Sequence, residues 1–173
     1  MRYLRAHADT IGLDPTRLCA WGASAGGHLS VFLGVKDSIV PDVLAKLFPD
    51  QSPKVSCVVD DFGPVDLSDP TFSNLRLGMF AGKGPGGDPE GYRDASPIFL
   101  VSKTSAPMII AQGYADRLVP FSQSQRLFEA LTAQKVPVQF RANSGGHGEA
   151  GLLSAQMDAI TEAEIAFIAE QMR

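Results

Sequence analysis

The sequence predicts one domain of the α/β class, a three-layer α/β/α sandwich in which helices cover both faces of a mainly parallel sheet. Three observations predict it. Strand-like and helix-like segments alternate along the chain, which is typical of parallel strands joined by crossover helices. The strand-like segments are apolar throughout, as expected of strands buried on both faces. The 173 residues contain no internal repeat and no inter-domain linker, so a single domain over residues 1–173 is expected.

The first part of the chain is expected to supply two strands and three helical stretches. Residues 3–11 read as a short helix that ends at a glycine, a common signal for a helix C-terminus. A buried strand is expected over 17–21 and a helix with an apolar face over 25–35. A proline opens a short helical stretch over 41–47. Residues 54–63 give a second buried strand that ends in polar side chains.

The remaining chain is expected to complete the sheet with two more strands. Residues 64–105 are rich in Gly, Pro, Ser and Asp and read as irregular, with room for two short helices. A third buried strand is predicted over 106–116, followed by a helix over 120–135 and a fourth strand over 136–142. A final helix is predicted over 148–172, because its apolar residues keep to one stripe.

Composition excludes several classes of partner. The chain carries 15 Lys and Arg against 19 Asp and Glu and has no basic cluster, so nucleic acid and anionic membrane surfaces are not expected as partners. No apolar run approaches the ~20 residues that span a bilayer. The first residues, MRYLRAHADT, lack the apolar core of a signal peptide, which predicts a cytoplasmic protein.

Metal ions and organic cofactors are not expected either. Cys19 and Cys57 lie in apolar, strand-like runs, where buried free thiols are the favoured interpretation and a disulfide is the alternative. No Cys and His residues have the spacing of a zinc site. Gly82, Gly84 and Gly87 match the spacing of a dinucleotide-binding loop, but no strand precedes them, so an ordinary loop is favoured.

The stretch AWGASAGGHLS, residues 20–30, predicts a nucleophile elbow at Ser24. A strand that turns sharply into a helix can hold an exposed serine at the turn, provided that its neighbours are small. Gly22 and Gly26 meet this requirement two positions either side, and Gly27 lets the helix approach the sheet. The backbone N–H of Ala25 then becomes a candidate oxyanion donor. The alternative is an ordinary serine in a strand-to-helix turn rich in Gly and Ala.

The elbow predicts an acid and then a histidine in loops after later strands. Asp116 follows the third predicted strand, and His147 lies in a glycine-rich loop after the fourth. The imidazole would take the Ser24 proton, and the carboxylate would orient the imidazole. Asp116 could instead cap the next helix or shape a turn. Asp60 and Asp61, which end the second strand, are the reserve acids.

Two other histidines are weaker candidates for the base. His7 lies on an early predicted helix with no route to Ser24. His28 lies one helical turn after Ser24, so its side chain is expected to face away from the serine, and a packing or hydrogen-bonding role is favoured.

Four stretches carry a resemblance to the α/β-hydrolase superfamily, and within it to esterases and lipases of the acetyl-xylan/feruloyl esterase and hormone-sensitive-lipase-like groups. They are IGLDPTRLCAWGASAGGHLSVFLG, DFGPVDL, DASPIFLVSKTSAPMIIAQGYADRLVPFSQSQRLFEAL and GGHG. The resemblance implies hydrolysis of small acyl esters through an acyl-enzyme on Ser24, without a metal or organic cofactor. One departure is Gln112-Gly113, where many members carry His-Gly, a pair that lies outside the expected triad.

A second departure is at the start of the chain. Members of the superfamily carry about four strands and a helix before the region that this sequence matches, including a loop that supplies part of the oxyanion hole. The resemblance therefore implies a truncated α/β-hydrolase fold, and a signal peptide could also lie in that preceding region. The strand from Arg17 to Trp21 would then lie at the sheet edge with unpaired backbone groups, so a homodimer or higher oligomer that covers this edge is expected.

Two rival functions remain open from the sequence. One is a serine peptidase of the prolyl-oligopeptidase type, which shares the elbow and the order of residues; the S-A-G-G-H run favours the esterase. The other is a catalytically inactive α/β module used for binding or assembly, which the unmatched oxyanion loop supports and the Ser24, Asp116 and His147 set opposes. Phe72, Met79 and Phe80 could line an acyl pocket, although local core is the favoured role.

Overall fold

The computed structural model describes residues 1–35, 46–69, 71–72 and 89–173. Its centre is a four-stranded sheet in the order β1-β2-β3-β4, in which every neighbouring pair is parallel. The strands are β1 (Cys19–Ala23), β2 (Cys57–Asp61), β3 (Met108–Gly113) and β4 (Val138–Asn143). The predicted parallel sheet is confirmed, and all of its carboxyl ends lie at one edge.

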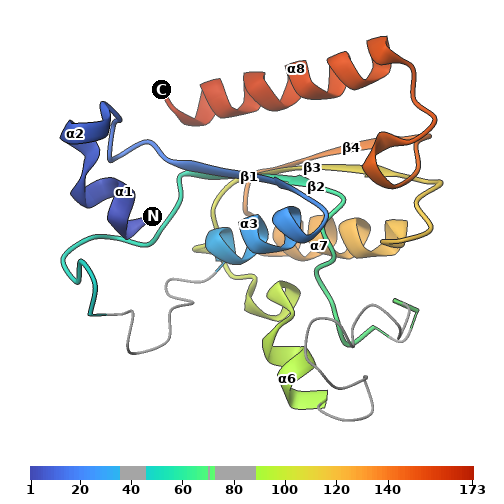
Figure 1. The fold of residues 1–173 in the computed structure, drawn as a ribbon. Coiled ribbons are helices and arrows are strands. Elements are labelled where there is room, and N and C mark those ends of the chain that lie inside the picture. The colour runs from blue at the N-terminus through green and yellow to red at the C-terminus, as the bar shows by residue number, and fades with distance from the viewer. Residues whose placement is uncertain (36–45, 70, 73–88) are drawn as a thin grey trace.

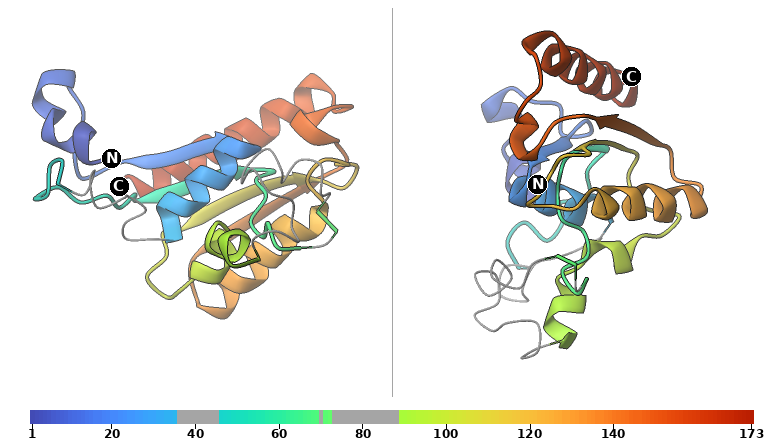
Figure 2. Two further views of the ribbon diagram at one scale, coloured as in Figure 1. Left: turned by 60° about the horizontal axis from the view of Figure 1, so that its bottom comes forward. Right: turned by 90° about the vertical axis from the view of Figure 1, so that its right-hand side faces the viewer.

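Helices cover both faces of the sheet, as predicted for a three-layer sandwich. Helices α3 (Ala25–Val35) and α7 (Phe121–Ala133) lie on one face, and α8 (Ser154–Gln171) lies on the other (Figures 1 and 2). The main core lies between the sheet and the α3/α7 layer, where Val31, Ile110 and Leu127 are fully buried. A smaller core includes Phe167 of α8.

The outlying helices differ in detail from the prediction. The first predicted helix is divided into α1 (Arg2–Ala6) and α2 (Ala8–Ile11), and it ends at Gly12, whose φ of 69° is left-handed. The described residues of the 64–105 stretch include two short helices, α6 (Pro89–Asp94) and η1 (Pro97–Leu100). In the helical stretch predicted over 41–47, residues 41–45 lie outside the described residues.

The last helix begins at Ser154, six residues later than the predicted start. Residues before it form the short helix η2 (His147–Glu149) and a turn. Within this segment Gly148, Glu149 and Gly151 have φ values of 66°, 62° and 87°, all left-handed and incompatible with a continuous right-handed helix. The glycine-rich segment therefore forms the loop that carries His147.

The prediction of free thiols is wrong, because Cys19 and Cys57 form a disulfide. The two residues are direct partners in the register of β1 and β2, and their Cα atoms are 4.6 Å apart, within the range that a disulfide spans. The strand positions were predictable, but the register that brings the two sulfurs together was not.

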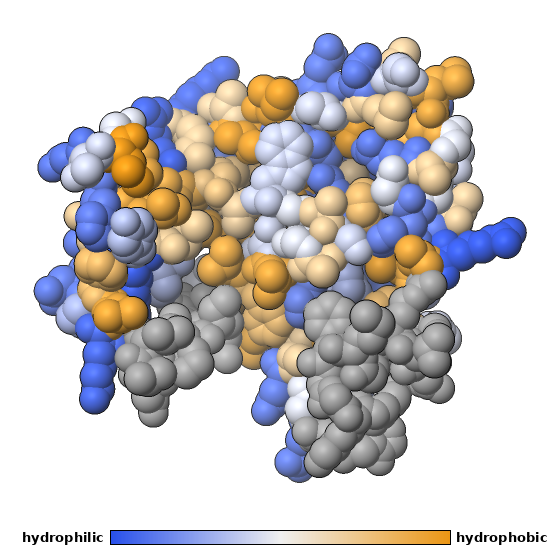
Figure 3. Space-filling model, in the orientation of Figure 1, coloured by the Kyte–Doolittle hydropathy of each residue, from blue (hydrophilic) through white to orange (hydrophobic). Residues whose placement is uncertain are grey.

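Strand β1 is an edge strand, as predicted, because among the described residues it pairs only with β2. Its Trp21 is 46% exposed, and the indole Nε1–H donates to Asp61 Oδ2 at 2.8 Å. The face of the molecule drawn in Figure 3 mixes polar and apolar residues, and its apolar side chains are spread over the view. Within the described ranges, no helix combines the length and apolar character that crossing a bilayer requires.

Candidate active site

Ser24 lies at the turn between β1 and α3, in the conformation that the glycine-rich stretch predicts. Its φ of 56° is left-handed, a region that costs a non-glycine residue about 1–3 kcal/mol unless its surroundings hold it. Two hydrogen bonds hold it here. The Ser24 N–H donates to the Asp61 carbonyl oxygen at 2.8 Å, and the Ser24 carbonyl accepts from the His28 N–H at 3.1 Å. The backbone conformation of Ser24 is therefore held by one hydrogen bond to the end of β2 and one from the first turn of α3.

The glycines around Ser24 do not all have the predicted role. A Cβ on Gly22 would overlap the backbone carbonyl group of Gly26, so Gly22 is required for the turn. A Cβ on Gly27 would overlap the Asp60 carboxyl group and lie 3.0 Å from Gly63 Cα, which confirms that Gly27 allows the helix to approach the sheet. A Cβ on Gly26, by contrast, would meet no described atom within 4 Å, so the predicted need for a glycine there is wrong.

His147 and Asp116 lie next to Ser24 in a continuous chain of hydrogen bonds. His147 Nε2 is 2.9 Å from Ser24 Oγ, and His147 Nδ1 is 2.9 Å from Asp116 Oδ2. With the proton on Nδ1, the ring donates to the carboxylate and accepts from the hydroxyl. The three residues follow β1, β3 and β4, whose carboxyl ends share one edge of the parallel sheet. This arrangement is the one that general-base activation of a serine requires.

The surroundings hold the imidazole and the carboxylate in place. Asp116 Oδ1 accepts hydrogen bonds from the backbone N–H groups of Leu118 and Val119, at 2.8 and 2.9 Å. The Asp116 side chain is fully buried, whereas 22% of the His147 side chain is exposed. The Phe62 ring meets the His147 ring edge to face, with centroids 4.9 Å apart. The exposed part of the imidazole is therefore available to a substrate.

Ala25, the predicted oxyanion donor, is the first residue of α3 and lies on the wall of the cavity beside Ser24. The N–H groups of the first helical turn have no acceptor within the helix. The Ala25 N–H is therefore free of an acceptor within the helix, and it can donate a hydrogen bond that stabilises the negative charge on a reacting carbonyl oxygen.

The reserve acids and the other histidines have different partners. Asp60 Oδ1 accepts from the Gly63 N–H at 3.0 Å, and Asp61 is bonded to Trp21 as described above. His28 is 5% exposed, and its Nδ1 donates to the Pro64 carbonyl at 2.7 Å, so its predicted structural role is confirmed. Burial lowers the pKa of His28, which keeps the ring neutral. His7 stacks on Tyr3 in α1.

A small apolar cavity of about 100 Å³ opens beside Ser24. Its wall comprises Ser24, Ala25 and His147 together with Pro64, Phe72, Leu118 and Val119. Phe72 is 5% exposed and packs with Leu67, Tyr92 and Val119, so it belongs to a local core and to the cavity wall at once. Met79 and Phe80, the other two predicted pocket residues, lie outside the described residues.

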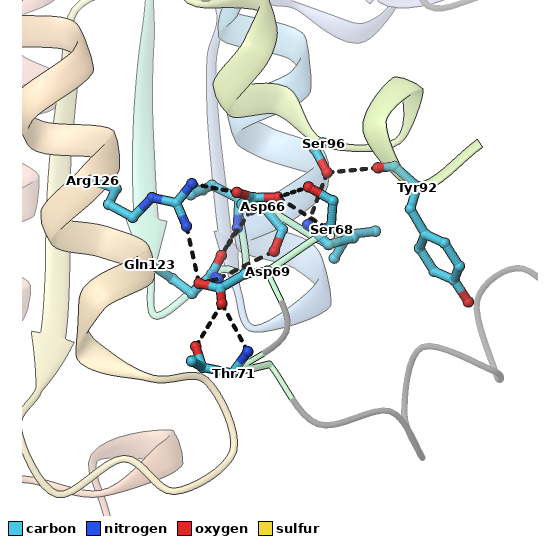
Figure 4. A network of polar contacts seen from close by, with 10 residues as sticks. Asp66, Ser68, Asp69, Thr71, Tyr92, Ser96, Gln123 and Arg126 are labelled. Carbon is cyan, nitrogen blue, oxygen red and sulfur yellow. Dashed lines mark hydrogen bonds and ion pairs between the residues drawn. The ribbon is translucent and has the colours of Figure 1, made fainter. Parts of the chain in front are cut away.

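A partly buried polar network, which the sequence did not indicate, holds residues next to this wall (Figure 4). The Arg126 guanidinium on α7 pairs with both Asp66 and Asp69, the latter at 2.9 Å. Gln123, fully buried on the same helix, accepts from the N–H groups of Val65 and Asp66 at 2.9 and 2.7 Å. Helix α7 therefore holds Val65, Asp66 and Asp69, which follow the wall residue Pro64.

Gln112 is a second residue that sequence reasoning missed. It was expected to lie outside the expected triad, but its Nε2 lies 3.1 Å from Asp116 Oδ2. The sequence feature that could have identified it is its position, one residue before the glycine that ends β3 and four residues before the acid.

Among the described residues, no group of three or more His, Cys, Asp or Glu side chains is arranged to hold a metal ion.

Two buried carboxyl groups lie close to the elbow. Asp60 is 0% exposed at the end of β2, and burial raises its pKa to about 8, with the Asp61 carboxylate adding to the shift. Burial, together with Asp61, also raises the pKa of Glu164 on α8. Both groups are therefore protonated in the folded protein over a pH range where the unfolded chain has lost these protons.

These carboxyl groups predict that stability falls as pH rises. Between about pH 4 and pH 8 the folded protein holds a proton on Asp60 that the unfolded chain releases, so the free energy of unfolding decreases across this range and levels off above it. Asp60→Asn keeps the shape and stays neutral at every pH. Urea unfolding at about pH 5 and pH 8 should show a smaller loss of stability for the variant than for the wild-type protein. Equal losses would contradict the assignment of Asp60 as a buried neutral acid.

Esterases of known sequence or structure are similar to this chain. The BD-FAE family model matches residues 1–131. The esterase LipC of Mycobacterium tuberculosis is 30% identical over 137 residues, which cover 76% of this chain and 34% of that protein. The chain therefore spans about a third of the length of this curated relative.

Solved structures of esterases are also similar to this chain. A truncated form of a carbohydrate esterase from gut microbiota has a TM-score of 0.80 at 28% identity, covering 99% of this chain and 65% of that one. A bifunctional GH43-CE protein of Bacteroides eggerthii has a TM-score of 0.81 at 27% identity, covering 99% of this chain and 26% of that one. The resemblance to esterases of the α/β-hydrolase superfamily is confirmed. With a family model that matches well over half of its residues, the chain belongs to the BD-FAE family.

Proposed function

We propose that this chain hydrolyses carboxylic esters of small acyl groups, with Ser24 as the nucleophile, His147 as the general base and acid, and Asp116 as the group that orients the imidazole. The observation that carries the proposal is the pair of 2.9 Å contacts that link Ser24 Oγ to His147 Nε2 and His147 Nδ1 to Asp116 Oδ2. The names of the relatives, esterase and carbohydrate esterase, favour esters over amides as substrates.

The reaction proceeds in two halves. Ser24 Oγ attacks the ester carbonyl carbon while its proton passes to His147 Nε2, and the imidazolium then gives that proton to the departing alkoxide. The acyl group is left on Ser24. In the second half a water molecule attacks the acyl carbon, His147 takes a proton from the water, and that proton returns to Ser24 Oγ as the carboxylic acid leaves. Asp116 stays ionised and stabilises the imidazolium in both halves.

The oxyanion that forms in each half is assigned to the Ala25 backbone N–H. This donor lies next to the nucleophile at the start of α3, where the helix dipole also favours negative charge. An oxyanion donor typically contributes about 10²- to 10³-fold to kcat.

The size of the cavity supports a small acyl group. About 100 Å³ accommodates only a few non-hydrogen atoms, and the wall of Pro64, Phe72, Leu118 and Val119 offers them apolar contacts. We therefore expect acetyl and propionyl esters to react with a higher kcat/KM than long-chain esters, because a longer chain would extend beyond this apolar wall.

Steady-state hydrolysis of p-nitrophenyl acetate by the wild-type protein and by Ser24→Ala tests the proposal. Hydrolysis by the wild type and its loss in the variant are expected. A peptide anilide in a parallel assay tests the peptidase alternative, and faster cleavage of the anilide than of the ester would favour it. A folded wild-type protein that hydrolyses neither compound would support the third function, a binding or assembly module.

The exposed edge of β1 supports a further part of the proposal, a homodimer or higher oligomer. Among the described residues β1 has a partner on one side only, and its own residue Trp21 is 46% exposed. Unpaired strand edges of this kind favour pairing with another chain. Light scattering coupled to size-exclusion chromatography should give at least twice the mass of 18.4 kDa. Trp21→Lys places a charge beside the edge and should shift the protein toward monomer; a monomeric wild-type protein would contradict this part.

A further inference from the structure

Gln112 is a buried amide that donates one of its hydrogen bonds to the acid of the site. It lies in β3 and is 0% exposed. Its Nε2 donates to Asp116 Oδ2 at 3.1 Å and is within 3.3 Å of the Val119 carbonyl oxygen. Its Oε1 accepts from the Ser124 hydroxyl of α7 at 2.9 Å. The side chain therefore connects the first turn of α7 to the carboxylate.

The orientation of this amide is fixed by its neighbours. The amide nitrogen faces a carboxylate oxygen and backbone carbonyl oxygens, all of which only accept hydrogen bonds. The opposite orientation would bring Oε1 against these acceptors and leave the Ser124 hydroxyl facing a donor. Ser124 is itself fully buried, so the arrangement is closed to water on that side.

The same carboxylate oxygen receives the His147 imidazole. Asp116 Oδ2 accepts from His147 Nδ1 at 2.9 Å and from Gln112 Nε2 at 3.1 Å, while Oδ1 accepts from two backbone N–H groups. The backbone donors hold one oxygen, and Gln112 holds the other together with His147. Without Gln112, the His147 contact alone would fix the rotation of the carboxylate on that side.

We infer that Gln112 is a positioning residue, which acts through Asp116 to hold the His147 imidazole in line with Ser24, and that Ser124 sets the orientation of the Gln112 amide. The inference deepens the proposed function and rests on it. A displaced or rotating imidazole lowers the rate of proton transfer from Ser24 without altering the cavity that holds the acyl group. Gln112 should therefore affect kcat more than KM.

Gln112→Leu tests this inference, because leucine fills a similar volume without a hydrogen-bonding group. With p-nitrophenyl acetate we expect kcat to fall about 10- to 100-fold and KM to stay within about twofold. The proton on His147 Nδ1, recorded in water as a low-field NMR resonance, should shift and exchange faster with solvent. Ser124→Ala should give the same changes at a smaller size, and it decides the question if Gln112→Leu does not fold.

Gln125→Leu is the matched control, since Gln125 lies on the exposed side of α7 and bonds only to Glu129 among the described contacts. It should leave the resonance and kcat unchanged. A folded Gln112→Leu protein with wild-type kcat and an unmoved resonance would overturn the inference. If the wild-type protein hydrolyses no ester but Gln112→Leu still moves the resonance, the proposed function fails while the positioning of His147 by Gln112 stands.

Discussion

Replacing His147 by alanine is expected to lower kcat for p-nitrophenyl acetate by about 10⁴- to 10⁶-fold. The imidazole is the group within hydrogen-bonding distance of Ser24 Oγ that can accept its proton, and without it the hydroxyl attacks the carbonyl as a weak nucleophile.

Asp116→Asn should lower kcat by about 10⁴-fold, because an amide can place a donor against His147 Nδ1 and favour the wrong tautomer of the imidazole. Steady-state kinetics with circular dichroism on each variant measures both effects.

His7→Ala is the control for this experiment. His7 stacks on Tyr3 in the N-terminal helices and has no described contact with the cavity, so its loss should leave kcat within about twofold of the wild type. If a folded His147→Ala protein kept a tenth or so of the wild-type kcat, His147 could not be the general base.

Gly22→Ala is expected to destabilise the fold and inactivate the site together. The added Cβ would overlap the backbone carbonyl group of Gly26, and a backbone cannot move aside as a side-chain end can. The start of α3 must then shift relative to β1, at a cost of about 1–3 kcal/mol in the free energy of unfolding. A shift of about 1 Å at Ser24 lowers kcat about 100-fold. Urea denaturation and ester hydrolysis measure the two effects.

Gly26→Ala provides a comparison four residues away. Its Cβ would meet no described atom within 4 Å, and alanine is the better helix former by about 1 kcal/mol, so this variant should be at least as stable as the wild type. Equal stability of the Gly22 and Gly26 variants would contradict the described geometry of the turn.

The sequence predicted the sheet and its covering helices because apolar runs and helical periodicity depend on nearby residues. The strand that ends at Ala23 and the helix from Ala25 were both expected, and Ser24 between them was identified from its small neighbours. The proximity of Asp116 and His147 to Ser24 was also predictable, since residues at the carboxyl ends of parallel strands must meet at one edge. Their contact distances required coordinates.

Other features depend on register and tertiary packing, which one sequence does not specify. The Cys19–Cys57 disulfide follows from a register that pairs the two residues directly across β1 and β2. Gln112 reaches Asp116 from β3 while Ser124, at the start of α7, donates to its amide oxygen. Helix α8 starts late because residues before it, such as Glu149, have left-handed φ values. A glutamate in a sequence does not predict that conformation.

The central claim is that Ser24 is a nucleophile activated by His147, and covalent labelling tests it most directly. The folded protein is incubated with a fluorophosphonate, digested, and its peptides are analysed by mass spectrometry. We predict one phosphonyl group on the peptide that contains Ser24, none on Ser24→Ala, and a rate of labelling that falls at least about 100-fold in His147→Ala. A folded wild-type protein that stays unlabelled at Ser24, or that is labelled equally fast without His147, would contradict the claim.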